Sequence, residues 1–363
     1  TVRNAGSLES PSLWSPEMPS LYTLETFLSY RTDEGNVHTL VDSEKVGIRS
    51  LRFDPDLGLF LNDSPYLLKG VCVHEDAGCL GNAVPAAVWH RRLSKLKHMG
   101  CNAVRMSHNP HMPELYSLCD ALGFLVIDEA FDEWEAPKNK WSTGHNVYPP
   151  KHEGYYSCFP EWHERDLTDL IRRDRNHPCV MLWSIGNEID YPNDPYCHPS
   201  FETMTGNNDS GKPSEERVYN PARPDAQRLA VLSKMLCDIV HRTDSTHPAT
   251  LAAAFPELSA SLGFLDPLDV VGYNYKEHLY AAHHETFPDK PFLGSENGHS
   301  LAAWKAVTDN AYISGQFLWT GIDYLGEAHG WPIHGSAAGL LTMAGFEKPS
   351  YFRRQSFWSA QPM

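Results

Sequence analysis

Short apolar runs alternate with helical segments through most of this chain, and this alternation constrains its fold more than any other feature. We predict eight strands, at 67–73, 102–106, 124–127, 180–183, 249–253, 270–273, 291–293 and 315–319. Each is followed by a helix or a long loop, with helices predicted at 88–99, 112–122, 162–176 and 226–241. Repeated β-α units with apolar strands imply a parallel sheet, and eight imply a closed barrel, so we predict an α/β fold of the (β/α)8 TIM type. A doubly wound sheet would need a glycine-rich phosphate loop after the first strand, and residues 70–74 are not one.

The first 58 residues follow a β pattern instead. We predict strands at 21–30, 37–41 and 44–53, with a hairpin turn at 33–36. Three or four strands are too few for a closed sandwich of about seven. The sequence therefore predicts a partial β-sandwich domain at 1–58 and a barrel domain at 59–363. A small sheet packed on the barrel is the alternative for the first segment.

The composition, with 41% hydrophobic and 21% charged residues, is that of a soluble globular protein. The net charge of −16 and the lack of a basic cluster argue against nucleic acid and anionic membrane as partners. We find no apolar run of about eighteen residues and no signal peptide. Because the chain opens at Thr1 inside a β pattern, we expect a truncated N-terminus, so a periplasmic, secreted or cytoplasmic location stays open.

The eight cysteines give no metal-binding pattern, since no Cys-x-x-Cys pair occurs. Four lie in apolar runs and are predicted to be buried free thiols: Cys72, Cys101, Cys119 and Cys179. Three lie in predicted loops, where a disulfide remains open: Cys79, Cys158 and Cys197.

Two of the predicted barrel strands lead into a glutamate beside an asparagine. The run V-M-L-W-S-I-G-N-E ends at Glu188, and P-F-L-G-S-E-N contains Glu296. These are the fourth and seventh strands, which lie across the barrel mouth from each other at the end where barrel active sites form. Two facing carboxylates are the minimal machinery for cleaving a glycosidic bond. A gap of roughly 5–5.5 Å retains the anomeric configuration through a covalent intermediate, whereas a wider gap admits water and inverts it.

Six motifs occur in order along the chain: N-A-V-R-M-S-H-N-P (102–110), L-C-D-A-L-G-F-L-V-I-D-E-A (118–130), R-R-D-R-N-H-P (172–178), W-S-I-G-N-E (183–188), G-S-E-N-G-H (294–299) and G-Q-F-L-W-T-G-I-D-Y (315–324). Together they resemble glycoside hydrolase family 2, and within it most closely the β-galactosidases, over about residues 10 to 358. The resemblance implies a retaining exo-β-galactosidase acting on terminal β-D-galactosyl residues of a β-galactoside or galacto-oligosaccharide. It also implies an immunoglobulin-like identity for the partial sandwich and leaves a homo-oligomer open.

The resemblance implies a role for each residue of the expected site. Glu188 matches the general acid/base, and Glu296 matches the nucleophile that attacks the anomeric carbon. Asn187 matches the residue that binds the sugar 2-hydroxyl, Tyr275 the tyrosine beside the nucleophile, and Arg105 the arginine that holds its charge. Arg105 could instead merely satisfy a buried carboxylate inside the barrel.

Four more residues match sugar contacts of the family. His108 and His299 match sugar-contacting histidines, Trp319 matches the indole floor under the terminal sugar, and His74 matches a residue lining the same pocket. Three of them also have a simpler interpretation as ordinary core side chains: His74, His108 and Trp319.

The chain departs from the family at its metal site. Metal-dependent members carry Glu-x-His shortly after D-E-A, and the corresponding residues here are Glu133, Trp134 and Glu135. We therefore predict no metal and no cofactor, with a hard cation held by the two carboxylates as the weaker alternative. The asparagine-x-lysine pair with which β-glucuronidases bind a carboxylate is not evident, which favours a neutral sugar.

Two long loops follow strands that end at the site. Residues 189–225 follow the strand of Glu188 and are predicted to form a lid on the leaving-group side. Residues 135–156 carry Trp141, Tyr148 and Tyr155. Together the loops predict a pocket closed at one end and hence exo-action, with plain surface excursions as the alternative.

Other functions remain open from the sequence. One is another family 2 exo-β-glycosidase, acting on glucuronides, mannosides or a decorated galactan. Another is a sugar-binding barrel that is inactive without the family's N-terminal domains. A third is a metal-dependent barrel hydrolase built on His74, His108 and Asp128.

Overall fold

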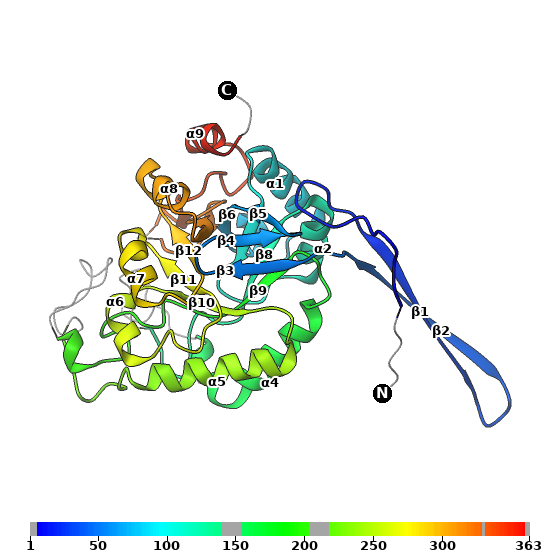
Figure 1. Cartoon of the computed structure of the whole chain (residues 1–363), viewed down its shortest axis with the longest axis horizontal. Helices are drawn as coiled ribbons and strands as arrows, with labels where there is room; N and C mark the ends of the chain where they lie inside the picture. The colour runs from blue at the N-terminus through cyan, green and yellow to red at the C-terminus, as the bar shows by residue number, and fades with distance from the viewer. Residues whose placement is uncertain (1–5, 139–153, 203–217, 329–330, 360–363) are drawn as a thin grey trace.

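In the computed structural model, which describes residues 6–138, 154–202, 218–328 and 331–359, eight parallel strands form a closed barrel (Figure 1). The strands are β6 (Leu68–Val73), β7 (Ala103–Met106), β8 (Leu125–Glu129), β9 (Val180–Asn187), β10 (Ala249–Ala253), β11 (Val271–Asn274), β12 (Phe292–Asn297) and β13 (Ile313–Leu318). They follow one another around the barrel in sequence order, and β13 closes it against β6. The predicted (β/α)8 barrel is confirmed, with Glu188 after its fourth strand and Glu296 in its seventh.

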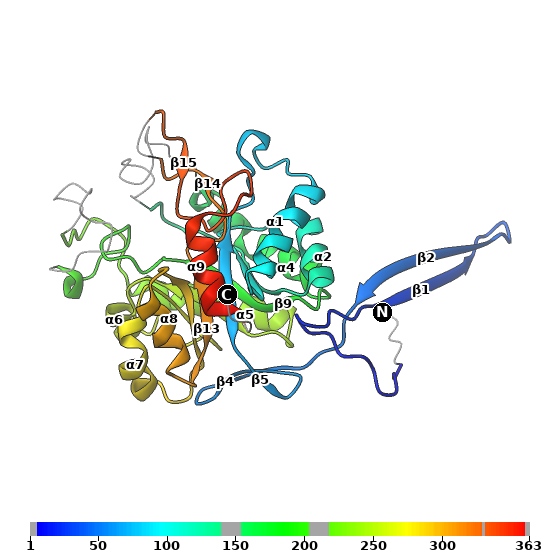
Figure 2. The ribbon, with the colours of Figure 1, turned by 90° about the horizontal axis from the view of Figure 1, so that it is seen from above.

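Helices surround the barrel (Figures 1 and 2). They are α1 (Ala86–His98), α2 (Pro113–Leu122), α4 (Phe159–Asp174), α5 (Arg228–Thr243), α6 (Pro256–Ser259), α7 (Tyr280–Thr286), α8 (Leu301–Thr308) and α9 (Pro349–Trp358). In α4, Leu167, Leu170 and Ile171 are buried at spacings of three and four residues, which places one face of the helix on the sheet. α2 ends at Gly123, whose φ of 76° is the left-handed conformation that glycine adopts most easily.

The barrel interior is filled by side chains, as the continuous apolar strand runs predict. Strands β7, β8, β9, β10, β11, β12 and β13 are buried along their whole length. At Gly70 in β6, a Cβ atom would lie 2.3 Å from the Phe317 ring. A side chain at position 70 would collide with the ring of Phe317 on the paired strand β13, so glycine is required there.

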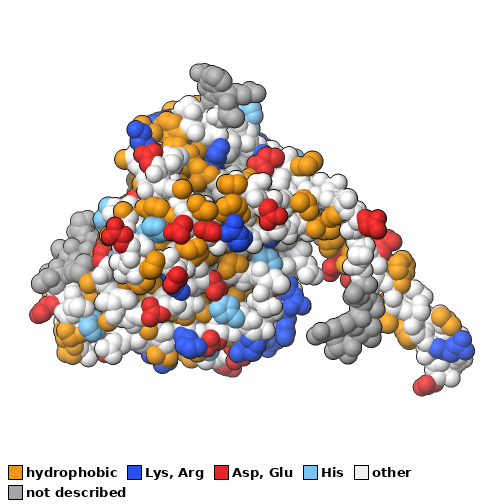
Figure 3. Space-filling view, viewed as in Figure 1, with side chains coloured by type: hydrophobic (Ala, Val, Ile, Leu, Met, Phe, Trp, Pro, Cys, Tyr) orange, Lys and Arg blue, Asp and Glu red, His pale blue; other side chains and the backbone are white. Residues whose placement is uncertain are grey.

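Two strands project from the body of the molecule as a ribbon (Figures 1 and 2). β1 (Tyr22–Arg31) pairs antiparallel with β2 (Val37–Val46). β2 is longer than the predicted 37–41, and the predicted strand at 44–53 is wrong, because residues 47–50 separate β2 from the next strand. The ribbon exposes apolar side chains (Figure 3): Leu24, Phe27, Leu28, Tyr30, Val37, Leu40 and Val41.

A small antiparallel sheet connects this segment to the barrel. It contains β3 (Leu51–Asp54), β4 (Gly58–Leu61) and β5 (Ser64–Tyr66). Both small sheets are consistent with a partial immunoglobulin-like segment. The predicted division between residues 58 and 59 falls inside β4, and the domain division stays a prediction.

The eight cysteines are free thiols. The predicted burial of Cys72, Cys101, Cys119 and Cys179 is confirmed, and Cys197, which the sequence places in a loop, is buried as well. In the described residues, no helix has both the length and the hydropathy needed to cross a bilayer.

Candidate active site

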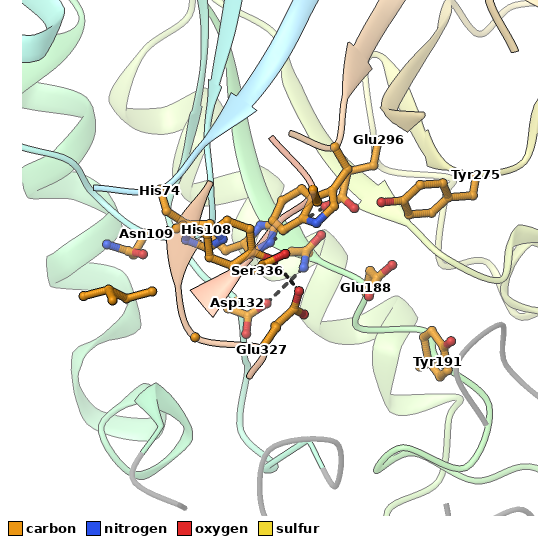
Figure 4. A pocket seen from close by; sticks show the side chains of 16 residues that line it. His74, His108, Asn109, Asp132, Glu188, Tyr191, Tyr275, Glu296, Glu327 and Ser336 are labelled. Carbon is orange, nitrogen blue, oxygen red and sulfur yellow. Dashed lines mark hydrogen bonds and ion pairs between the residues drawn. The ribbon is translucent and has the colours of Figure 1, made fainter. Parts of the chain in front are cut away.

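A pocket of about 670 Å³ lies at the carboxyl end of the barrel strands (Figure 4). The strand ends and the loops directly after them supply most of its lining. Seven of the nine predicted site residues line it: His74, His108, Asn187, Glu188, Tyr275, Glu296 and Trp319. The structure thus brings together side chains that are up to 245 residues apart in the sequence, from His74 to Trp319.

Glu296 lies almost fully buried in β12, with 4% of its surface exposed. Arg105 Nη1 donates hydrogen bonds to Glu296 Oε1 (2.8 Å) and to the carbonyl of Ser295 (3.2 Å). Burial raises the pKa of Glu296 most strongly, the charge of Arg105 lowers it, and the nearby charge of Glu188 raises it again. The resulting pKa lies above that of an ordinary glutamate.

Arg105 is the centre of a hydrogen-bond network beneath the pocket, and it is completely buried in β7. Its Nε and Nη2 donate to both oxygens of Glu129 at 2.8–3.1 Å, and Nη2 also donates to Asn187 Oδ1 (2.9 Å). Burial acts to raise the pKa of Glu129, but the Arg105 charge and the hydrogen bond from His108 lower it below the ordinary value. Arg105 therefore satisfies a buried carboxylate and contacts Glu296 at the same time, so the two interpretations of it are compatible.

Glu188 and Tyr275 follow β9 and β11 in left-handed backbone conformations, with φ of 46° and 56°. Such conformations cost energy in residues other than glycine, and they persist where surrounding contacts fix them. Asn274 Nδ2 donates to Asn187 Oδ1 (3.1 Å) and to Glu188 Oε1 (3.4 Å), and Tyr275 N donates to the carbonyl of Glu296 (2.7 Å). In Figure 4 the Tyr275 hydroxyl points toward Glu296. Three strand ends are thus joined directly around the two carboxylates.

Aromatic rings form one wall of the pocket. The rings of His108 and Trp319 stack with centroids 5.2 Å apart, and His74 packs edge-on against both. Burial lowers the pKa of His74 well below its usual value, and His108 acts in the same direction. A neutral imidazole has one donor and one acceptor nitrogen, which suits sugar hydroxyl groups.

Two residues considered from the sequence lie elsewhere. His299 does not line the pocket; its Nε2 lies 2.8 Å from the carbonyl of Trp319, so it supports the backbone of a lining residue rather than facing the cavity. Asp128 accepts a hydrogen bond from the Tyr116 hydroxyl of α2 (2.7 Å), on the outside of the barrel. The metal-dependent alternative needed Asp128 beside two pocket histidines, and the structure does not place it there.

The pocket also contains residues that the sequence did not place in the site. Asp132, after β8, accepts hydrogen bonds from Asn187 Nδ2 (3.0 Å) and Lys138 Nζ (2.7 Å). Glu327 and Ser336 come from a hairpin of β14 (Tyr324–Leu325) and β15 (Gly335–Ser336), beyond the last barrel strand. The only nearby sequence signal is the motif that ends at Tyr324.

The predicted lid loops are described only in part. Tyr191, at the start of the first loop, lines the pocket. Residues 203–217 of that loop and the side chains of Trp141 and Tyr148 lie outside the described residues. Tyr155 lines a neighbouring cavity instead, so the closed end predicted from these loops stays a prediction.

Comparison with known proteins identifies the family. The sequence model described as "Glycosyl hydrolases family 2, TIM barrel domain" matches residues 55–350. The chain belongs to glycosyl hydrolase family 2. It is 36% identical to the beta-galactosidase BoGH2A of Bacteroides ovatus, over 97% of this chain and 45% of that protein. A putative beta-glucuronidase of Formosa agariphila is 30% identical, over 98% of this chain and 35% of its own length.

A crystal structure of a family 2 member from Bacteroides cellulosilyticus superposes with a TM-score of 0.74 at 31% identity, over 97% of this chain and 41% of that one. The chain therefore spans less than half the length of these family 2 relatives.

At the family 2 metal position, Glu135 does not replace the missing histidine as a metal ligand. Glu135, which stands where metal-dependent members have histidine, accepts hydrogen bonds from Arg228 on both oxygens (2.8 and 2.9 Å). A carboxylate paired in this way is not available as an oxygen ligand. Within the described residues, three potential metal ligands meet at another place: Asp120, His177 and Cys179. Asp120 already accepts hydrogen bonds from His177 Nδ1 and from the backbone N–H of Cys179. Burial raises the pKa of the Cys179 thiol, which disfavours the thiolate that a metal needs. That group is therefore best explained as a structural hydrogen-bond cluster.

Proposed function

We propose that this barrel is the catalytic part of a retaining exo-β-galactosidase, with Glu188 as general acid/base and Glu296 as nucleophile. Family 2 membership supports a β-glycosidase, and the name of the 36% identical relative supports galactose as the sugar. The observation that bears most on the choice of sugar is the charge of the pocket lining.

Four carboxylates line the pocket: Asp132, Glu188, Glu296 and Glu327. Among the described lining residues there is no lysine or arginine, and the segment from Tyr324 to Ala338 contributes only uncharged lining residues besides Glu327. A uronic acid would add a negative charge that no lysine or arginine of the described lining could pair with, which is costly in a partly desolvated site. The hydroxyl groups of a neutral sugar can instead donate hydrogen bonds to these oxygens. The lining thus favours a galactoside over a glucuronide.

The proposed reaction is a two-step displacement. Glu296 attacks the anomeric carbon while Glu188 protonates the leaving oxygen; Glu188 then removes a proton from water, which attacks the same carbon and releases Glu296. Arg105 donates to the carboxylate that attacks, so it stabilises the ionised form needed for the first step. Asn187 is fixed by Arg105 and Asp132, which orients its amide for the sugar 2-hydroxyl.

Substrate choice tests the proposal directly. We expect kcat/KM for nitrophenyl β-galactoside to exceed that for nitrophenyl β-glucuronide by at least about a hundredfold, since an unpaired buried charge costs about 3 kcal/mol or more. A panel that also includes the β-glucoside and β-mannoside measures this. A preference for the glucuronide would overturn the assignment of the sugar, and binding of galactosides without turnover would favour a sugar-binding barrel.

The pH profile tests the nucleophile. Glu296 must be ionised to attack, so activity is lost as the pH falls through its pKa. Because burial raises that pKa, we expect the acid limb of kcat/KM to lie above the value of an ordinary glutamate, about 4.3. Hydrolysis of nitrophenyl β-galactoside from about pH 3 to 8 measures the limb. An acid limb below that ordinary value would contradict the electrostatics described for Glu296.

A further inference from the structure

Glu327 reaches the pocket from outside the barrel strands. After β13 the chain forms the β14–β15 hairpin, in which Tyr324 pairs with Ser336, and Glu327 stands two residues beyond the end of β14. Its backbone has a φ of 46°, a conformation that favours glycine. In Figure 4 its carboxylate points into the pocket beside Asp132 and on the side of Glu188.

One hydrogen bond holds this carboxylate, and further contacts fix the residues just before it. The Tyr324 hydroxyl donates a hydrogen bond to Glu327 Oε2. Tyr324 is itself 3% exposed, with its ring centroid 4.2 Å from that of His74 and 5.5 Å from that of Trp319. The backbone N–H of Leu325, which follows Tyr324 in the chain, donates a hydrogen bond to the Asp76 carboxylate (3.2 Å). The position of Glu327 is therefore set by the same aromatic wall that lines the pocket.

The two-step mechanism gives Glu327 no task. It is a half-buried carboxylate in a pocket whose described lining includes no lysine or arginine, so no cation of the lining balances it. A carboxylate held at a pocket wall is a strong acceptor for hydroxyl groups, and it repels a second carboxylate. Both properties concern the choice of sugar rather than the bond-breaking step.

We propose that Glu327 is a specificity-determining residue, which accepts hydrogen bonds from hydroxyl groups of a neutral sugar and excludes a sugar that carries a carboxylate. This deepens the proposed function and rests on it. Tyr324 acts through Glu327, as the residue that positions it.

Kinetics of three variants test the proposal. With nitrophenyl β-galactoside, Glu327→Ala is expected to raise KM about tenfold or more while kcat changes by less than about threefold. Glu327→Gln keeps the shape but removes the charge, so the ratio of kcat/KM for the galactoside over the glucuronide should fall about tenfold or more. Tyr324→Phe, which removes only the positioning hydroxyl, should shift KM in the same direction by a smaller factor.

Glu285→Gln is the matched control, because Glu285 is an exposed glutamate of α7 and does not line the pocket. It changes the net charge equally and should leave KM and the substrate ratio at wild-type values. The proposal is overturned if both Glu327 variants match this control, or if they lower kcat alone. Thermal melting of Glu327→Gln and Tyr324→Phe verifies that the fold is retained.

A binding measurement separates this proposal from the proposed function. In a Glu296→Gln background, which cannot form the glycosyl ester, equilibrium binding of nitrophenyl β-galactoside is compared with and without Glu327→Ala. At least about tenfold weaker binding in the double variant supports a role for Glu327 even if the wild-type chain does not turn the substrate over. Equal binding in the two proteins overturns that role, whatever the activity of the wild type.

Discussion

Replacing Glu296 with glutamine is expected to lower kcat/KM by a factor on the order of 10⁴ or more on every glycoside that the wild type cleaves. The amide of glutamine cannot form the glycosyl ester of the first step. A better leaving group therefore does not restore activity in this variant. The fold should survive, because the side-chain oxygen of glutamine can still accept the hydrogen bond from Arg105 Nη1. Steady-state kinetics together with a thermal melt measure both parts.

The Glu188→Gln variant tests the general-acid role of Glu188. Loss of a general acid costs about 10²–10⁴-fold when the leaving group is a sugar, which needs a proton. A nitrophenolate leaves without one, so cleavage of its glycosidic bond should be less impaired, whereas Glu296→Gln should not distinguish the two substrates. Near-normal turnover in both variants would exclude this pair as the catalytic machinery. A loss in Glu188→Gln that is the same for both leaving groups would remove the acid role from Glu188.

Arg105→Met is expected to lower the free energy of unfolding by about 3–5 kcal/mol. Methionine fills much of the space, but it leaves Glu129 fully buried without its cation and removes a hydrogen bond from Glu296. The loss of stability comes from leaving the Glu129 charge without a partner, and it is larger than the stabilisation that an ordinary ion pair provides. Urea unfolding at neutral pH measures the change.

Arg165→Met is the control for that variant. Arg165 lies on α4 with 68% of its side chain exposed and pairs with Asp169 at 3.6 Å. Exposed pairs contribute little, so its unfolding free energy should change by no more than about 0.5 kcal/mol. If the two arginine variants were equally stable, the network beneath the pocket would not have the energetic role that its burial implies.

The barrel could be predicted because its strands are buried on both faces, so their sequences are mostly apolar runs. Strand ends were less certain. β9 extends to Asn187 instead of stopping at Trp183, since polar side chains at the barrel mouth can stay in the ladder while facing the site. β2 was underestimated for the opposite reason. Asp42 and Ser43 were left between two predicted strands, but in an exposed ribbon polar side chains are compatible with strand pairing.

The predicted site residues that line the pocket lie at or just after the ends of barrel strands, and their roles stay predictions. His299 follows β12 closely in its motif, yet its ring contacts the backbone carbonyl of Trp319 and does not line the pocket. Glu327 could not be found from a pattern, since a short hairpin after the last strand determines its position. Local periodicity does not report the long-range packing of Tyr324, which donates a hydrogen bond to Glu327, against His74.

The network around Arg105 has a consequence for the reaction cycle. In the resting protein this one guanidinium contacts two carboxylates, those of Glu129 and Glu296, so the contact set has an excess negative charge. Transfer of a glycosyl group to Glu296 would convert one of these anions into a neutral ester. Arg105 and Glu129 would then balance each other, and the covalent intermediate would be the electroneutral state of this contact set.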